Sequence, residues 1–233
     1  MRGPADDEFE LLGMAPGVGR LFADALAEPA GVILIAGPAG SGRSTTIAAA
    51  LAKRPDALAV GIEDRAGAEA AIDAALSGRL VLAEIDAGDC VGAIARLRAM
   101  RVEPFPIAAS VRATIAQRLV EGLCSDCRVP VQAAGSLSAL LGFDPGTLVY
   151  EPRGCVSCGG TGFAGKIGLF EGFAFDAPIR RLIGFGGDEA IIASHAFRDR
   201  PNFGGAARAM VRSGLIRAEE GVRASRVHML EAC

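Results

Sequence analysis

The sequence predicts an α/β fold built on a doubly wound, mainly parallel sheet, and three observations support this. Apolar runs of strand length alternate with longer helical segments over the first hundred residues. The first of these runs has no polar alternation, which is typical of a strand covered by helices on both faces. The chain has 233 residues and 51% hydrophobic content, so it is large enough to bury such a core.

The first two elements lead into a glycine-rich loop. Residues 18–27 repeat apolar side chains at helical spacing, and Pro29 ends that helix before the first strand. Residues 32–36 are an unbroken apolar run, which predicts a strand buried on both faces. The chain then turns through residues 37–42, three of which are glycine, into an alanine-rich helix.

The alternation then repeats twice. Residues 57–62 predict a second buried strand, and residues 67–76 are good helix formers that Ser77 and Gly78 bring to an end. Residues 79–86 predict a third strand with acidic side chains near its carboxyl end. Ligands of parallel sheets bind at this edge, where the glycine-rich loop also lies.

The later segments are expected to be helical apart from one strand. Asp89 is placed to cap a helix through Met100, because apolar residues follow one stripe of it. Residues 107–123 predict a further helix, residues 166–175 a short strand, and the remainder from about residue 177 a mostly helical C-terminal part.

Composition limits the classes of partner. The net charge is −3 and no basic block occurs, which argues against a nucleic-acid-binding protein. No run of 18 apolar residues is present, and the first 13 residues carry charges where a signal peptide needs an apolar segment. We therefore expect a cytoplasmic protein without direct membrane insertion.

The glycine-rich loop matches the spacing of a phosphate-binding loop except at one position. Backbone amides and a helix N-terminus surround a phosphate in such a loop, its lysine reaches the β and γ phosphates, and its Ser/Thr hydroxyl binds Mg²⁺. Here Arg43 stands in the lysine position, and its planar guanidinium is larger than an ammonium. A turn without a ligand is the alternative. The expected nucleotide contacts are Gly37, Pro38, Ala39, Gly40, Ser41, Gly42, Arg43, Ser44 and Thr45.

Four carboxylates are candidates for the catalytic group. Glu63 and Asp64 end the second predicted strand, and Glu84 and Asp86 end the third. Any of them could hold the metal ion or polarise water, and the alternative is that each is simply solvated. The sequence does not choose among them.

Two Cys-x-x-Cys pairs predict a structural metal site. Cys124 with Cys127 and Cys155 with Cys158 supply four thiolates, the full tetrahedral shell of Zn²⁺. An iron–sulfur cluster or a redox dithiol are the rival interpretations. With four protein ligands the ion would stabilise the segment and would not catalyse. Cys90 stands apart and is expected to be a small buried helix residue.

Several segments together resemble the C-terminal ATPase domain of the type II secretion and type IV pilus assembly ATPases. The similarity extends from about residue 12 to about residue 226, and the combination of the tetracysteine segment with the string at residues 116–120 is specific. The segments that carry it are residues 37–46, 74–82, 92–105, 116–120 leading to the first cysteine pair, and 155–158 with 161–163.

The resemblance implies a RecA-like domain that uses ATP, Mg²⁺ and Zn²⁺ and assembles as a hexameric ring on the cytoplasmic side of an inner-membrane machine. By this similarity the four cysteines are the zinc ligands, and Glu63 is the acidic catalytic group. The nucleotide contacts that carry over from the family are Gly37, Gly40, Gly42, Ser44 and Thr45.

The chain also departs from the family's pattern. The loop lysine is Arg43, and the usual histidine of the His box aligns with Asp86. Residues 60–64 resemble part of either the Asp box or the Walker B segment, with no room for both. The N-terminal domains that precede the ATPase core in the family are expected to be absent. A deletion that removes one of the two catalytic segments should also shorten the surface from which neighbouring subunits supply arginines to the phosphate.

We therefore expect a trimmed, catalytically degenerate relative that binds nucleotide and acts as a component or regulator of a secretion or pilus machine, in a ring of its own or with related ATPases. An active motor subunit using Arg43 in place of lysine is the main alternative, and a small P-loop kinase is a further one. The expected domains are a P-loop RecA-like core at residues 1–123, a tetracysteine zinc-binding element at 124–165 and a mostly helical C-terminal subdomain at 166–233.

Overall fold

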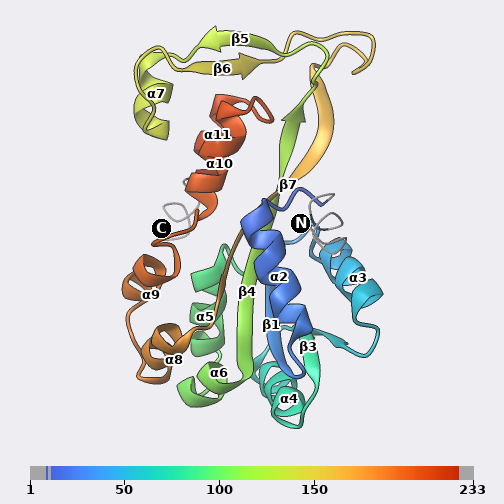
Figure 1. Cartoon of the computed structure of the whole chain (residues 1–233), viewed down its shortest axis with the longest axis vertical. Helices are drawn as coiled ribbons and strands as arrows, with labels where there is room; N and C mark the ends of the chain where they lie inside the picture. Colours follow the sequence, from blue (N-terminus) through green and yellow to red (C-terminus); the bar gives the residue numbers. More distant parts are fainter. Residues whose placement is uncertain (1–8, 10–11, 226–233) are drawn as a thin grey trace. The chain divides into compact units, whose positions relative to one another are not determined.

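The computed structural model describes Phe9 and residues 12–225, and its chain divides into two compact units (Figure 1). The sheet unit combines Met1–Arg118 with Phe170–Arg200, and the cysteine unit combines Leu119–Leu169 with Pro201–Cys233. The three-part division predicted from the sequence stays a prediction. None of the helices in the described residues combines the length and apolar character that spanning a bilayer requires.

The sheet unit is organised around a five-stranded sheet in the order β2-β3-β1-β4-β7. β1 pairs in parallel with β3 on one side and with β4 on the other, and β2 pairs in parallel with β3. The mainly parallel α/β fold is therefore confirmed. The strands are β1 (Gly31–Ala36), β2 (Leu58–Ile62), β3 (Leu80–Ile85), β4 (Val111–Leu123) and β7 (Phe163–Ala174).

The core lies against β1, whose six residues are all buried. Ile33 and Ile35 of β1 share a hydrophobic cluster with Phe22 of helix α2 (Pro16–Ala27) and with Ile47 of helix α3 (Arg43–Lys53). α2 lies in front of β1 in Figure 1. A strand buried along its whole length needs helices on both faces, as the unbroken apolar run predicts.

Most predicted elements of the sheet unit are confirmed. Helix α4 (Arg65–Leu76) begins two residues before its predicted range. Helix α5 (Cys90–Ala99) has Asp89 as its N-cap, with a carboxylate oxygen accepting from the Gly92 N–H at 2.8 Å. β2 exists, but the prediction that it is buried is wrong, because it is the edge strand and only Ile62 is buried within it.

The predicted helix over residues 107–123 is wrong. Helix α6 (Pro104–Ser110) ends at Ser110, and the chain continues as the 13-residue strand β4. β4 pairs with β1 so that Ala113 faces Ile33 and Ile115 faces Ile35. Long-range pairing of a strand buried on both faces decides this conformation, and local periodicity does not distinguish such a strand from a buried helix.

The cysteine unit has secondary structure between its two cysteine pairs. Strands β5 (Val129–Gln132) and β6 (Leu148–Glu151) pair antiparallel. The Arg128 guanidinium lies 5.1 Å from the centre of the Tyr150 ring and donates to the Gly214 carbonyl. The helices of this unit are α7 (Gly135–Leu141), α10 (Phe203–Arg212) and α11 (Ala218–Ser225).

The mostly helical C-terminal part predicted from about residue 177 is confirmed over the described residues. Two of its helices, α8 (Ala177–Gly184) and α9 (Glu189–Ala196), follow β7 in the sheet unit. Asp176 caps α8 by accepting from the Ile179 N–H at 2.8 Å.

Candidate functional site

The glycine-rich loop leaves β1 through Gly37, whose N–H donates to the Ile85 carbonyl at the end of β3 at 3.4 Å. Gly37 has φ +156°, and a Cβ at this position would lie 2.4 Å from Ser41 Oγ and 2.5 Å from the Gln117 carbonyl oxygen. The loop therefore closes on itself and on β4 as tightly as a residue without a side chain allows.

The N-terminus of α3 is open to a ligand. Gly42 is its N-cap in the left-handed conformation, and no side chain among the described residues caps the helix. The first-turn amides of such a helix lack intrahelical partners and carry partial positive charge. Ser44 and Thr45 are exposed beside them. An uncapped helix N-terminus after a glycine-rich turn is the arrangement of a phosphate-binding loop, and the roles of Ser44 and Thr45 as nucleotide contacts stay predictions.

A buried glutamine holds the loop from β4, and sequence reasoning missed it. Gln117 Nε2 donates to the Ser41 carbonyl at 2.9 Å, and both residues are at most 4% exposed. Ser41 Oγ and Gln117 Oε1 find no hydrogen-bond partner within the described chain. A polar residue interrupting the apolar run of β4 was the available signal, but the wrong helix assignment concealed which element it faced.

Arg43 does not extend as a free cation. Its Nε lies 3.0 Å from Oε1 of Glu84, and the two side chains are 12% and 31% exposed. Glu84 sits on β3 opposite Ile35 in the parallel register, so its backbone is fixed beside the strand that leads into the loop. The residue in the lysine position is thus neutralised within the chain.

The four candidate carboxylates lie at the ends of two different strands. Glu84 is on β3, the strand next to β1, and Asp86 directly follows it, whereas Glu63 and Asp64 follow β2, which is separated from β1 by β3. Asp64 caps α4 by accepting from the Gly67 N–H at 2.8 Å, and Glu63 is exposed. Asp86 is exposed and directly follows Ile85, the residue bonded to Gly37. Their catalytic roles stay predictions.

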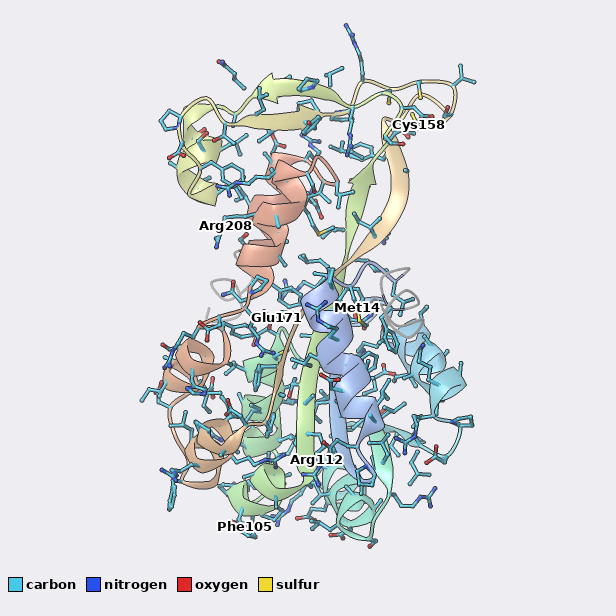
Figure 2. The ribbon with its side chains drawn as sticks, viewed as in Figure 1. Met14, Phe105, Arg112, Cys158, Glu171 and Arg208 are labelled. Carbon is cyan, nitrogen blue, oxygen red and sulfur yellow. The ribbon has the colours of Figure 1, made fainter. Side chains whose placement is uncertain are left out.

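The structure brings together all four paired cysteines. Their Sγ atoms lie within 4.8 Å of one another, and three of the pairs are 3.7 to 3.9 Å apart (Figure 2, where Cys158 is labelled). Zn–S bonds of about 2.3 Å in a regular tetrahedron place the sulfurs about 3.8 Å apart. The cluster therefore fits a tetrahedral Zn²⁺. Gly159 and Gly160, which follow the second pair, both have positive φ.

The local backbone prepares one of these thiols for metal binding. Cys158 Sγ accepts from the Cys155 N–H at 3.2 Å and from the Gly162 N–H at 3.1 Å. The Cys155 N–H and then the Gly162 N–H stabilise the thiolate and lower the pKa of Cys158 to about 6. Burial raises the pKa of Cys127 to about 11.

The sequence of this chain can be compared with those of known protein families. A family model described as type II/IV secretion system protein matches residues 46–223, which is well over half of the chain. The chain belongs to this family. The resemblance to the secretion and pilus ATPases predicted from the sequence is therefore confirmed.

Individual relatives of the type II/IV secretion system family give the same result. Type II secretion system protein E of Klebsiella pneumoniae is 31% identical over 95% of this chain and 54% of its own. The type IV pilus assembly ATPase PilB of Thermus thermophilus is 33% identical over 76% of this chain and 25% of its own. This chain spans about half the length of the first curated relatives it matches.

Solved structures share the fold. The pilus retraction motor PilT with bound ADP superposes with a TM-score of 0.66 at 17% identity, over 97% of this chain and 69% of PilT. The ATPase DotB of Legionella pneumophila gives a TM-score of 0.61 at 15% identity, over 91% of this chain and 63% of DotB.

The alignment with one relative concerns the predicted shortening of the ATPase core. The match to the Klebsiella protein extends over 268 residues, which exceeds the 233 residues of this whole chain. The relative therefore carries residues that have no counterpart here, as a shortened family member requires.

Cys90 is confirmed as a small buried helix residue. Its N–H donates to Oε1 of the buried Glu171 at 2.9 Å, and its Sγ lies 3.4 Å from the Thr114 carbonyl oxygen; Glu171 is labelled in Figure 2. Burial and then the neighbouring Glu171 charge raise the pKa of Cys90 well above its usual range, so the thiol stays protonated. This contact joins the start of α5 to β7, and no pattern in the sequence indicates it.

Proposed function

We propose that this chain binds a nucleoside polyphosphate in the loop at residues 37–45 and hydrolyses ATP weakly or not at all. The Arg43–Glu84 ion pair is the observation that carries the second part of the proposal. A phosphate-binding loop needs a cation that can reach the β and γ phosphates. In this chain the residue in the lysine position is Arg43. Its guanidinium is paired with the carboxylate of Glu84 on the neighbouring strand β3.

Nucleotide binding is supported by the parts of the loop that do not depend on Arg43. The uncapped start of α3 and the exposed Ser44 and Thr45 provide amides and hydroxyls for phosphate oxygens. With Glu84 paired and Asp64 capping a helix, Asp86 is the acidic residue we assign to the Mg²⁺ shell together with Ser44. ATP and Mg²⁺ are thus the proposed cofactors.

The cysteine cluster is proposed to hold one structural Zn²⁺. Cys124, Cys127, Cys155 and Cys158 complete the coordination of the ion, so no position is left open for a reacting water. The ion would link the end of β4 to the turn after β6 within the cysteine unit. The expected contribution is to folding.

The family supports a place in a type II secretion or type IV pilus machine. We propose a cytoplasmic component or regulator, peripheral to the inner membrane, that works in a homo-hexamer or in a hetero-hexamer with related ATPases. A motor subunit that uses Arg43 in place of lysine is the second candidate, since Ser44 and Thr45 stand exposed at the start of α3. The third alternative, a small P-loop kinase, has no observation in its favour.

Phosphate release with ATP and Mg²⁺ tests the proposal. The purified chain should release phosphate near background, and Arg43→Lys should raise the rate because an ammonium can reach the γ phosphate. Arg54→Lys is the matched control, since Arg54 also forms an ion pair, with Asp56 at 3.0 Å, outside the loop. Robust magnesium-dependent ATP hydrolysis by the unaltered chain, lost in Asp86→Asn or Glu63→Gln, would show instead that the chain is an active motor subunit.

A further inference from the structure

Glu84, the partner of Arg43 in the ion pair, belongs to the sheet and not to the loop. It lies on β3 between the buried residues Ala83 and Ile85, in register with Ile35. Because the strand fixes its backbone, its carboxylate is a permanent feature of the sheet edge at which the loop opens. The Arg43 side chain meets it at 3.0 Å and is only 12% exposed.

We call the loop at residues 37–45 with the start of α3 the cradle. The Arg43–Glu84 ion pair changes the charge that the cradle presents to each phosphate of a nucleotide. The uncapped amides of α3 act on the phosphates that lie over the helix N-terminus, and they do not depend on Arg43. A third phosphate adds negative charge, which in an intact loop is met by an uncompensated lysine. In this chain the corresponding cation is already neutralised, and the Glu84 carboxylate adds negative charge beside it.

A second guanidinium near this edge is also engaged. Arg118 of β4 donates to the carbonyl of Gly88, in the segment that follows β3. That contact joins β4 to the segment after Asp86. Within the loop itself, the charge contact of Arg43 is the one with Glu84.

We infer that the Arg43–Glu84 ion pair makes the cradle select nucleoside diphosphates over triphosphates, with Glu84 as the specificity-determining residue. This inference rests on the proposed nucleotide binding. The chain would then act as a sensor of nucleoside diphosphate. Occupancy of its loop would not report the concentration of ATP. Removing the carboxylate frees the guanidinium to reach a third phosphate.

Calorimetric titration with ADP and with ATP, both with Mg²⁺, tests the inference on the full chain. The unaltered protein should bind ADP at least as tightly as ATP. Glu84→Gln should tighten ATP binding about tenfold more than ADP binding, because a charge-assisted contact to phosphate becomes available. The double variant Arg43→Met with Glu84→Gln should lose this gain.

The control is Glu69→Gln, which removes the carboxylate partner of Arg65 at 2.7 Å on the surface of α4 and should leave both affinities unchanged. Melting curves show that each variant is folded. Tighter binding of ATP than of ADP by the unaltered chain, or equal shifts of both affinities in Glu84→Gln, overturns the inference while nucleotide binding stands. Failure of the unaltered chain to bind either nucleotide overturns the proposed function, and the inference with it.

Discussion

Gly37→Ala should destabilise the sheet unit and abolish nucleotide binding, because the loop leaves no room for a methyl group. The new Cβ would lie 2.5 Å from the Gln117 carbonyl oxygen, and this backbone atom belongs to β4 and cannot rotate away. It would also lie 2.4 Å from Ser41 Oγ, in a side chain that is 4% exposed. Reaching ordinary contact distance requires the loop and β4 to separate by roughly 1 Å.

Two costs add to give the magnitude. Overpacking a buried site costs about 1–3 kcal/mol, and positive φ at a residue with a side chain costs about 1–2 kcal/mol more. The free energy of unfolding should therefore fall by about 2–5 kcal/mol, which for a chain of this size lowers the melting temperature by roughly 5–15 °C. Denaturant titration measures the first quantity and thermal melting the second.

Gly40→Ala and Gly17→Ala are the matched controls. Gly40 has φ +77° but nothing within 4 Å of a new Cβ, so only the backbone cost of about 1–2 kcal/mol applies. Gly17 lies in the first turn of α2 with open space around it, so alanine should be neutral or stabilise by roughly 0.5–1 kcal/mol. If Gly37→Ala matched Gly40→Ala in stability, the tight closure on β4 would be refuted.

Two further predictions concern the cysteine unit. Metal analysis should find about one Zn²⁺ per chain, because four thiolates complete the coordination shell. Cys155→Ser should lose the ion, whereas the control Cys90→Ser, outside the cluster, should keep it. Metal retained by Cys155→Ser would contradict this. Glu151→Gln should raise the melting temperature at pH 7, because burial and then the Glu219 charge raise the pKa of Glu151, so its ionised form is less stable in the folded chain. The difference in melting temperature between the variant and the unaltered chain should shrink as the pH falls below the ordinary pKa of a glutamate near 4.5, where the carboxyl is neutral in both states. Glu121→Gln, at an exposed position, is the control. A difference that does not depend on pH would be evidence against this cause.

Features with local signals could be predicted from the sequence. β1 follows from an unbroken apolar run, α5 from a capping aspartate before an apolar stripe, and the cysteine cluster from two short spacings. In each case the residue types and their spacing carry the signal, even where, as for the two cysteine pairs, the fold must bring distant residues together. The glycine spacing of the loop around Gly37 is a signal of the same kind.

Features that depend on strand order could not be predicted. Residues 107–123 are predicted to be a helix, but the strand β4 is largely buried and shows no regular polar alternation, so only its pairing with β1 reveals it as a strand. Arg43 meets Glu84 because β3 is the neighbour of β1, and Gln117 reaches the loop because β4 is the other neighbour. The same order places β2, with Glu63 and Asp64, one strand further from the loop.

A crystal structure of the full chain with ADP and Mg²⁺ tests the central claim most directly, namely that the amides at the start of α3 bind a diphosphate without help from Arg43. The expected result is a diphosphate over the loop at residues 37–45, with Arg43 Nε still about 3.0 Å from Glu84 Oε1. A guanidinium turned away from Glu84 onto the phosphates, or a loop left empty at saturating ADP, would contradict it.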